Sequence, residues 1–102
     1  MHIDHMKKAG VFKKLSGNVG EKYQEWHNAV FDESSPFDKK TMELMALTAS
    51  AAIKCSYCIE SHAEKAKSFG ASQEEIAKAI EIASVVGAGS VISYGLEGLD
   101  IN

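Results

Sequence analysis

The segment FGASQEEI, residues 69–76, ends one predicted helix and begins the next. Gly70 stands where a helix C-terminus favours a left-handed residue, and glycine adopts that conformation at little steric cost. Ser72 and Glu75 fit a capping box, in which the Ser72 hydroxyl accepts from the amide of Glu75 and the Glu75 carboxylate accepts from the amide of Ser72. The segment therefore predicts two helices joined by a very short connection.

Helical patterns extend from this segment in both directions. Good helix formers such as Ala, Glu, Lys and Leu dominate, and β-branched residues never alternate with polar ones over the length of a strand. The predicted helices cover about residues 4–15, 20–32, 41–53, 58–69 and 73–94, with breaks near Ser16–Gly17 and around Pro36. We predict an all-α protein, a compact bundle of about five helices.

Length, charge and hydropathy exclude several classes of protein. The 102 residues predict a single domain over residues 1–102. Eleven basic and fourteen acidic residues are scattered along the chain, whereas a nucleic-acid-binding protein needs a clustered basic surface. No stretch is expected to approach the ~20 apolar residues of a membrane span, and the N-terminus lacks the apolar core of a signal peptide. By elimination we expect a cytoplasmic protein that binds neither nucleic acid nor membrane.

The chain is also expected to associate with itself. A domain of this size buries only about two-thirds of the surface of its unfolded chain, so its own core is marginal. Ala79, Ala83 and Gly87 recur every four residues, and small side chains stacked in this way let another backbone approach closely. This pattern predicts tight helix packing, either within the domain or between subunits.

Two cysteines and a histidine share one predicted helix face in the segment Cys55-Ser56-Tyr57-Cys58-Ile59-Glu60-Ser61-His62. With Cys55 at 0° on a helical wheel, Cys58 falls at about 300° and His62 at about 340°. An unperturbed thiol has a pKa of about 8.5, so only ~3% is the reactive thiolate at neutral pH. A neighbouring histidine or a helix N-terminus can raise that fraction, and a second cysteine one turn away can resolve an oxidised sulfur as a disulfide. The pattern therefore favours thiol-redox chemistry.

Three other interpretations of the cysteine pair stay open. In the first, the protein is a redox-sensing or assembly module, with a reversible disulfide and no fast turnover. In the second, Cys55, Cys58 and His62 bind zinc with a fourth ligand such as Glu43, although structural zinc sites commonly draw on two separated pairs. In the third, the pair is inert. A purely structural role for a disulfide is weak, because closing so short a loop stabilises a fold by only ~2 kcal/mol.

The spacing Glu43-x11-Cys55-x2-Cys58-x3-His62 resembles the signature of the alkylhydroperoxidase D family, within the carboxymuconolactone decarboxylase superfamily. The flanking segments 42–47 and 69–76 are similar too, so the resemblance covers about residues 36–95 and fits the short, single-unit members. It implies an all-α fold and homo-oligomers, commonly trimers or hexamers. The decarboxylase branch uses no cysteine pair, so Cys55 and Cys58 point to the peroxidase branch.

The resemblance implies reduction of small hydroperoxides at the expense of a thiol or dithiol reductant, with no cofactor and no metal. Cys58 corresponds to the thiol attacked by the peroxide, Cys55 to the resolving thiol, and His62 and Glu43 to the proton relay. Tyr57 stands where well-studied members have a histidine. On one straight helix Glu43 would lie about 18 Å from Cys55. The relay therefore implies a break between them, although residues 49–54 contain neither Gly nor Pro.

Overall fold

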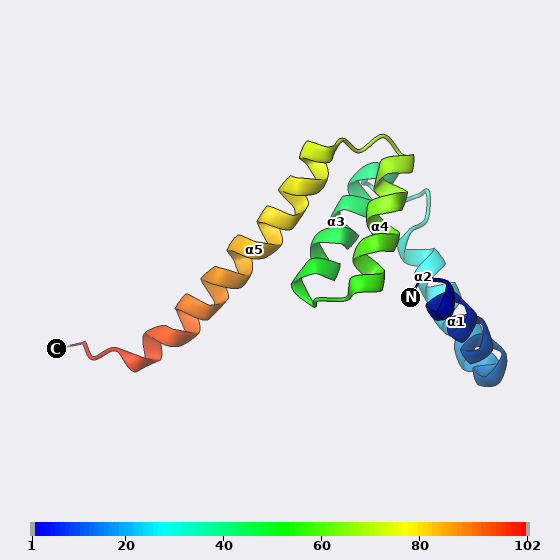
Figure 1. Cartoon of the computed structure of the whole chain (residues 1–102), viewed down its shortest axis with the longest axis horizontal. Helices are drawn as coiled ribbons and strands as arrows, with labels where there is room; N and C mark the ends of the chain where they lie inside the picture. The colour runs from blue at the N-terminus through cyan, green and yellow to red at the C-terminus, as the bar shows by residue number, and fades with distance from the viewer. Residues whose placement is uncertain (1, 102) are drawn as a thin grey trace. The chain divides into compact units, whose positions relative to one another are not determined.

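A computed structural model describes residues 2–101, with side chains from residue 4 onward (Figure 1). The described residues form five α-helices, a terminal 3₁₀ helix and no strand, which confirms the predicted all-α class. The elements are α1 (His2–Ser16), α2 (Asn18–Val30), α3 (Lys39–Ala52), α4 (Ser56–Ser68), α5 (Gln73–Gly95) and η1 (Leu96–Gly98).

The chain divides into two compact units, residues 1–39 and residues 40–102. The first unit holds α1 and α2, which are separated at Gly17, a residue with a φ of 51°. The break predicted near Ser16–Gly17 is therefore confirmed. Tyr23, Trp26 and Val30 lie along α2, and all three are exposed. The assignment of the whole chain to one domain stays a prediction.

The second unit is built on α3 and α4, an antiparallel pair joined by a tight turn, with α5 following (Figure 1). Its core is small: Leu47 is fully buried and packs with Ile76 and Ala79 of α5. A polar contact also joins α3 to α5, because the Thr48 hydroxyl donates to the carbonyl of Ala79 at 3.2 Å. These contacts fix the first turns of α5 against α3.

The turn between α3 and α4 is a Schellman motif without glycine. The amide of Cys55 donates to the carbonyl of Ser50 at 3.0 Å, and the amide of Lys54 donates to that of Ala51 at 3.1 Å. Lys54 has a φ of 59°, the left-handed conformation that this motif requires at the residue after the cap. The break that the relay implied is therefore present, at a lysine that carries no sequence signal for it.

The turn between α4 and α5 is the one that the sequence predicts. Gly70 has a φ of 94° and ends α4 in a second Schellman motif. Both hydrogen bonds of the predicted capping box between Ser72 and Glu75 are present. The backbone amide of Ser72 and the Lys40 ammonium, 2.9 Å away, hold the pKa of the Glu75 carboxyl below its ordinary value.

One expectation from the sequence is wrong. No stretch was expected to approach a membrane span, but the helical segment Gln73–Gly98 is long and apolar enough for one. It meets this criterion by length and composition alone, as core helices of water-soluble proteins also do. Only 11% of its most apolar window is buried in this chain. The expectation failed because the apolar residues of this helix are interrupted by serines and glycines, so that its hydropathy is high only as an average over the whole segment.

The left-handed lysine gives a stability prediction. A non-glycine residue in this conformation costs about 1–2 kcal/mol, and the Lys54 side chain is exposed, so little packing is lost with it. We expect Lys54→Gly to raise the free energy of unfolding by about 1 kcal/mol, as measured by urea denaturation.

Lys65→Gly is the matched control, because Lys65 is an exposed lysine inside α4. There the same substitution should lower the free energy of unfolding by about 1 kcal/mol. Equal changes in the free energy of unfolding for Lys54→Gly and Lys65→Gly would contradict the left-handed conformation of Lys54.

Candidate redox site

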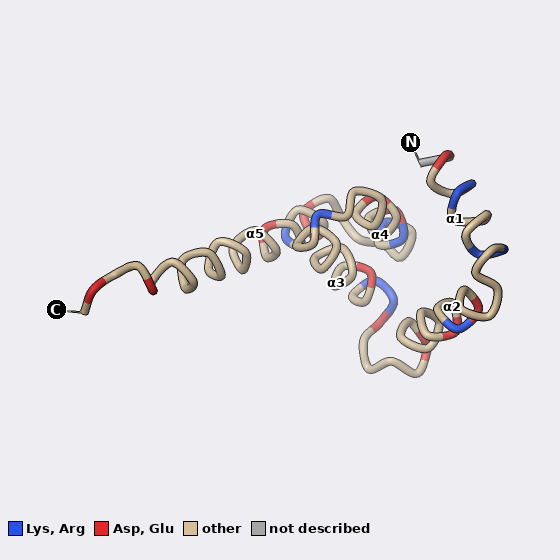
Figure 2. Tube along the Cα trace, turned by 90° about the horizontal axis from the view of Figure 1, so that it is seen from below, with Lys and Arg blue, Asp and Glu red and all other residues tan. Residues whose placement is uncertain are grey.

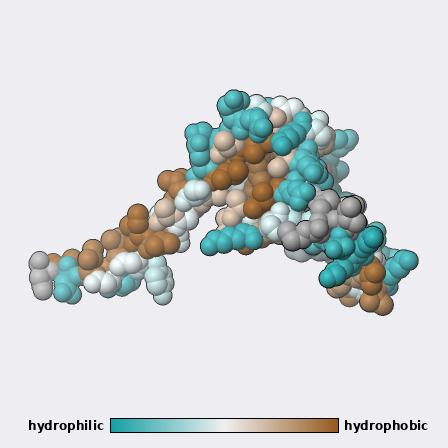
Figure 3. All heavy atoms as spheres, viewed as in Figure 1, coloured by the Kyte–Doolittle hydropathy of each residue, from teal (hydrophilic) through white to brown (hydrophobic). Residues whose placement is uncertain are grey.

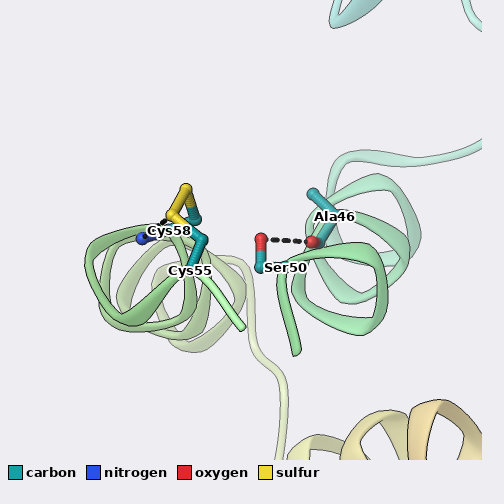
Figure 4. Close-up of a disulfide and its surroundings, with 4 residues drawn as sticks. All are labelled: Ala46, Ser50, Cys55 and Cys58. Atoms are coloured by element: carbon teal, nitrogen blue, oxygen red, sulfur yellow. Dashed lines mark hydrogen bonds between the residues drawn. A yellow bond between two sulfur atoms is a disulfide. The ribbon is translucent and has the colours of Figure 1, made fainter. Parts of the chain in front are cut away.

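Cys55 and Cys58 form a disulfide at the start of α4 (Figure 4). Their Cα atoms are 5.2 Å apart, and both residues are half-buried. Cys55 is the N-cap of α4, and Cys58 is the third residue of its first turn. The structure therefore pairs the two sulfurs that the spacing predicted to share one face.

The sulfur of Cys55 takes the place of the usual capping oxygen. Cys55 has an extended backbone, and its Sγ accepts from the amide of Cys58 at 3.2 Å. An N-cap acceptor satisfies an amide that has no partner within the helix, and the positive end of the helix dipole favours negative charge there. The same position would stabilise a Cys55 thiolate once the disulfide is reduced.

Glu43 and His62 form a close polar pair between α3 and α4. The Glu43 Oε1 lies 2.7 Å from the His62 Nδ1, and Glu43 is only 7% exposed. A carboxylate oxygen accepts hydrogen bonds and an imidazole N–H donates them, so the two side chains are complementary at this distance. This contact fixes the orientation of the imidazole and occupies Nδ1, so that Nε2 is the ring nitrogen left for other partners.

The turn at Lys54 brings this pair together. Because α4 runs back along α3, Glu43 on the first helix meets His62 on the second, nineteen positions later in the chain. His62 follows Cys58 by four residues, so their side chains are neighbours on α4. The structure thus places all four predicted site residues on one helical hairpin.

Two residues that position the site escaped the sequence analysis. Ser50, on α3 opposite the disulfide, is buried, and its hydroxyl donates to the carbonyl of Ala46 at 2.6 Å (Figure 4). Its own carbonyl accepts from the amide of Cys55. Lys54 is the other residue. Neither could have been found from its residue type, because serine is common on exposed helix faces and lysine is not typical of left-handed turns.

The zinc interpretation is not supported by this geometry. Among the described residues, no three His, Cys, Asp or Glu side chains are grouped closely enough to hold a metal ion. The two sulfurs are bonded to each other, and a disulfide sulfur is not the thiolate ligand that zinc requires.

Comparison with known proteins places these residues in a family context. The model of the carboxymuconolactone decarboxylase family matches residues 18–100. An uncharacterized protein from the cox locus of Paracoccus denitrificans is 26% identical over 92 residues, which are 90% of this chain and 82% of that protein.

Two solved structures are similar to this chain. A protein from Methanobacterium thermoautotrophicum has a TM-score of 0.80 and 28% identity, over 85% of this chain and 94% of that one. A protein from Thermotoga maritima has a TM-score of 0.74 and 32% identity, over 90% of this chain and 78% of that one. The latter is described as a carboxymuconolactone decarboxylase family protein with a suggested part in the antioxidative response.

The capping sulfur can be tested by its effect on stability. Serine is a strong N-cap residue and alanine is a poor one. Under reducing conditions we expect Cys55→Ala to unfold with a free energy about 1 kcal/mol below that of Cys55→Ser, as measured by urea denaturation. Equal stability of the two variants would show that side chain 55 does not cap α4.

Proposed function

Because this chain belongs to the carboxymuconolactone decarboxylase family, we propose that it is a thiol-dependent peroxidase of that family, which reduces small hydroperoxides through Cys55 and Cys58. The observation that carries the proposal is the contact between the buried Glu43 and the half-buried His62, one helical turn from Cys58. The suggested antioxidative role of the Thermotoga maritima protein is consistent with it.

Burial argues that the Glu43–His62 pair has a purpose beyond stability. Removing a carboxylate from water is costly, and apolar side chains of similar size commonly stabilise a fold as well or better. A glutamate–histidine pair on the surface would serve solubility without this cost. A carboxylate that holds one ring nitrogen, so that the other can exchange protons beside a thiol, is instead a typical arrangement for general acid–base chemistry.

The proposed cycle begins with Cys58. His62 takes the thiol proton, and the Cys58 thiolate attacks the outer oxygen of the hydroperoxide. The O–O bond breaks, and His62 returns the proton to the departing alkoxide, so that an alcohol leaves and Cys58 becomes a sulfenic acid. Cys55 then attacks the Cys58 sulfur, the S–O bond breaks, and water leaves as the disulfide forms.

A thiol or dithiol reductant completes the cycle. Its thiolate attacks the disulfide, and a second thiol releases the reduced pair, so that two electrons pass from the reductant to the protein. The N-cap position suits Cys55 to these steps, because the helix N-terminus favours its thiolate both as the attacking and as the leaving group.

Peroxidase turnover with a dithiol reductant is the direct test. General acid–base catalysis contributes about 10²–10⁴-fold, so we expect His62→Ala and Glu43→Gln to lower kcat/KM by at least about tenfold each. Cys58→Ser should reduce turnover to the uncatalysed rate. Peroxide consumption by the reduced protein, followed under excess dithiol, measures all three.

Glu64→Gln is the matched control for Glu43→Gln, because Glu64 is an exposed carboxylate on the same hairpin. It should leave kcat/KM unchanged. Equal rates for wild type and Cys58→Ser would refute the peroxidase proposal.

The relay can also be tested without turnover. In the Cys55→Ser background, which keeps a capping oxygen, we expect the pKa of Cys58 to lie below the ordinary value of about 8.5. Adding Glu43→Gln should raise that pKa again, because the imidazole loses its partner. The pH dependence of alkylation by iodoacetamide measures both, and an ordinary pKa in both proteins would count against a relay.

A redox-sensing module is the second candidate, and Tyr57 at the position of the family histidine is the observation that favours it. In this case the Cys55–Cys58 disulfide forms and reopens reversibly, but dithiol-driven turnover stays negligible. Oxidised and reduced protein would then differ in oligomeric state or partner binding. Gel filtration of the two forms distinguishes this candidate from a peroxidase.

A further inference from the structure

The Schellman motif that ends α3 places the side chain of Ser50 beside that of Cys55. In this motif the residues at C3 and C″ are joined through their backbones, and their side chains commonly make a hydrophobic contact. Here these two residues are Ser50 and Cys55, because the amide of Cys55 donates to the carbonyl of Ser50 at 3.0 Å. Figure 4 shows the Ser50 hydroxyl on α3, across from the disulfide. The pair at this turn is therefore a hydroxyl and a sulfur.

The second Schellman motif of the chain, at the end of α4, has the usual apolar pair. The amide of Ala71 donates to the carbonyl of Ala66 at 2.9 Å, so these two residues correspond to Cys55 and Ser50. Ala66 is fully buried, and Ala71 packs against the core around Leu47. An alanine at position 50 would complete the first motif in the same way. The turn itself therefore does not explain the hydroxyl of Ser50.

Ser50 is a buried polar residue in a largely apolar part of α3. Between Glu43 and Lys54 the chain has no charged residue, and its polar side chains are Thr48 and Ser50 alone. Figure 2 shows α3 without charge beyond its first turns, and Figure 3 shows hydrophobic residues gathered where α3, α4 and α5 meet. Ser50 is only 5% exposed, and alanine would fit there with a higher helix propensity.

The two hydroxyls of this stretch have different partners. The Thr48 hydroxyl lies 3.2 Å from the carbonyl of Ala79, so it joins α3 to α5. The Ser50 hydroxyl donates to the carbonyl of Ala46, and to none of the described residues outside α3. In the helix that carbonyl also accepts from the backbone amide of Ser50. The Ser50 hydroxyl can therefore turn away from Ala46 without leaving an unpaired carbonyl.

We propose that in the reduced protein the Ser50 hydroxyl turns from the carbonyl of Ala46 to the Cys55 sulfur and donates a hydrogen bond to its thiolate. A hydroxyl hydrogen rotates to suit its partner, so the change needs no movement of the backbone. In the oxidised protein the sulfur carries no charge, and the hydroxyl stays on Ala46. The amide of Cys58, 3.2 Å from the same sulfur, is the first donor, and Ser50 is the second.

A second donor changes both the acidity of Cys55 and the ease with which the disulfide opens. Hydrogen bonds to a charged group favour the charged form, so the pKa of the Cys55 thiol falls. Because the thiolate exists only in the reduced protein, the same bond favours reduction of the disulfide. This role rests on the proposed function for its use in turnover, where Cys55 is the resolving thiol.

The pKa of the Cys55 thiol is the direct measure. In the Cys58→Ser background, the pH dependence of alkylation by iodoacetamide reports on Cys55 alone. We expect Ser50→Ala to raise this pKa by about one, which is a tenfold change in the ratio of thiolate to thiol. The substitution alters no other titratable group of the hairpin. Between residues 43 and 62 these groups are Glu43, Lys54, Tyr57, Cys58, Glu60 and His62.

Ser84→Ala is the matched control. Ser84 lies on α5, is exposed, and donates to the carbonyl of Ile80, four residues before it, at 2.9 Å. It therefore has the same local hydrogen bond as Ser50 but no sulfur beside it. Ser84→Ala should leave the pKa of Cys55 unchanged.

The equilibrium with dithiothreitol separates this role from a structural one. Dithiothreitol gives two electrons to the Cys55–Cys58 disulfide and closes to its own cyclic disulfide, which leaves two protein thiols. At pH 9 the disulfide of Ser50→Ala should be about tenfold harder to reduce than that of wild type. At a pH below the Cys55 pKa of both proteins the difference should vanish, because the hydroxyl stabilises only the thiolate. A structural effect on the disulfide would be the same at both pH values.

Ser50→Ala should fold at least as well as wild type, because alanine has the higher helix propensity. The proposal is overturned by an unchanged Cys55 pKa in Ser50→Ala, by an equal rise in Ser84→Ala, or by a difference in the dithiothreitol equilibrium that does not vary with pH. Neither measurement uses peroxide. A protein without peroxidase activity could therefore still have this hydrogen bond, and the two proposals can fail separately.

Discussion

The backbone of Cys55 ends one helix and begins the next, and the site depends on this double role. Its amide closes the Schellman motif of α3 on the carbonyl of Ser50, while its sulfur caps the first turn of α4. Cys55 alone therefore provides hydrogen-bond partners for backbone groups at the end of α3 and at the start of α4 that have no partner within their helix. Since no loop intervenes, α4 has little freedom to turn relative to α3, and the sulfur pair is held at a fixed place on the hairpin.

Glu43 and His62 are the second constraint, because they join the two arms of the hairpin. The apolar core nearby is small, with Leu47 the largest fully buried side chain among the described residues. So small a core has too few apolar side chains to surround a polar pair completely. Glu43 precedes Leu47 on α3 by four residues, and His62 follows Cys58 on α4 by four residues, so the pair lies about one helical turn from each. The chain thus uses the same short hairpin for its fold and for its candidate chemistry.

The sequence was informative wherever a residue type has one strong local preference. The sequence predicted the end of one helix at Gly70 and the start of the next at Ser72 and Glu75. Both helix ends are present, at the C-terminus of α4 and the N-terminus of α5. The spacing of Cys55, Cys58 and His62 placed them on one face. Glu43 could be linked to them only through the family resemblance, because its burial is a tertiary property. Lys54 and Ser50 could not be identified, since a left-handed lysine and a buried helical serine are both imposed by the packing around them.

The family name by itself does not select a reaction, because it covers decarboxylases as well as peroxidases. The sulfur pair of this chain supports the proposed peroxidase activity. The comparison with the Thermotoga maritima protein shows that this chain keeps the family's helical framework over 90% of its length. A framework of this kind does not determine the reaction, which depends on a few side chains that it carries.

The capping sulfur also bears on how much the hairpin must rearrange between its two redox states. The Cys58 amide that faces Cys55 belongs to the first turn of α4. When the Cys55–Cys58 disulfide is reduced, the Cys58 amide is therefore in place to donate to a negatively charged Cys55 sulfur. A donor that is already oriented towards the sulfur stabilises a thiolate there without a rearrangement of the backbone.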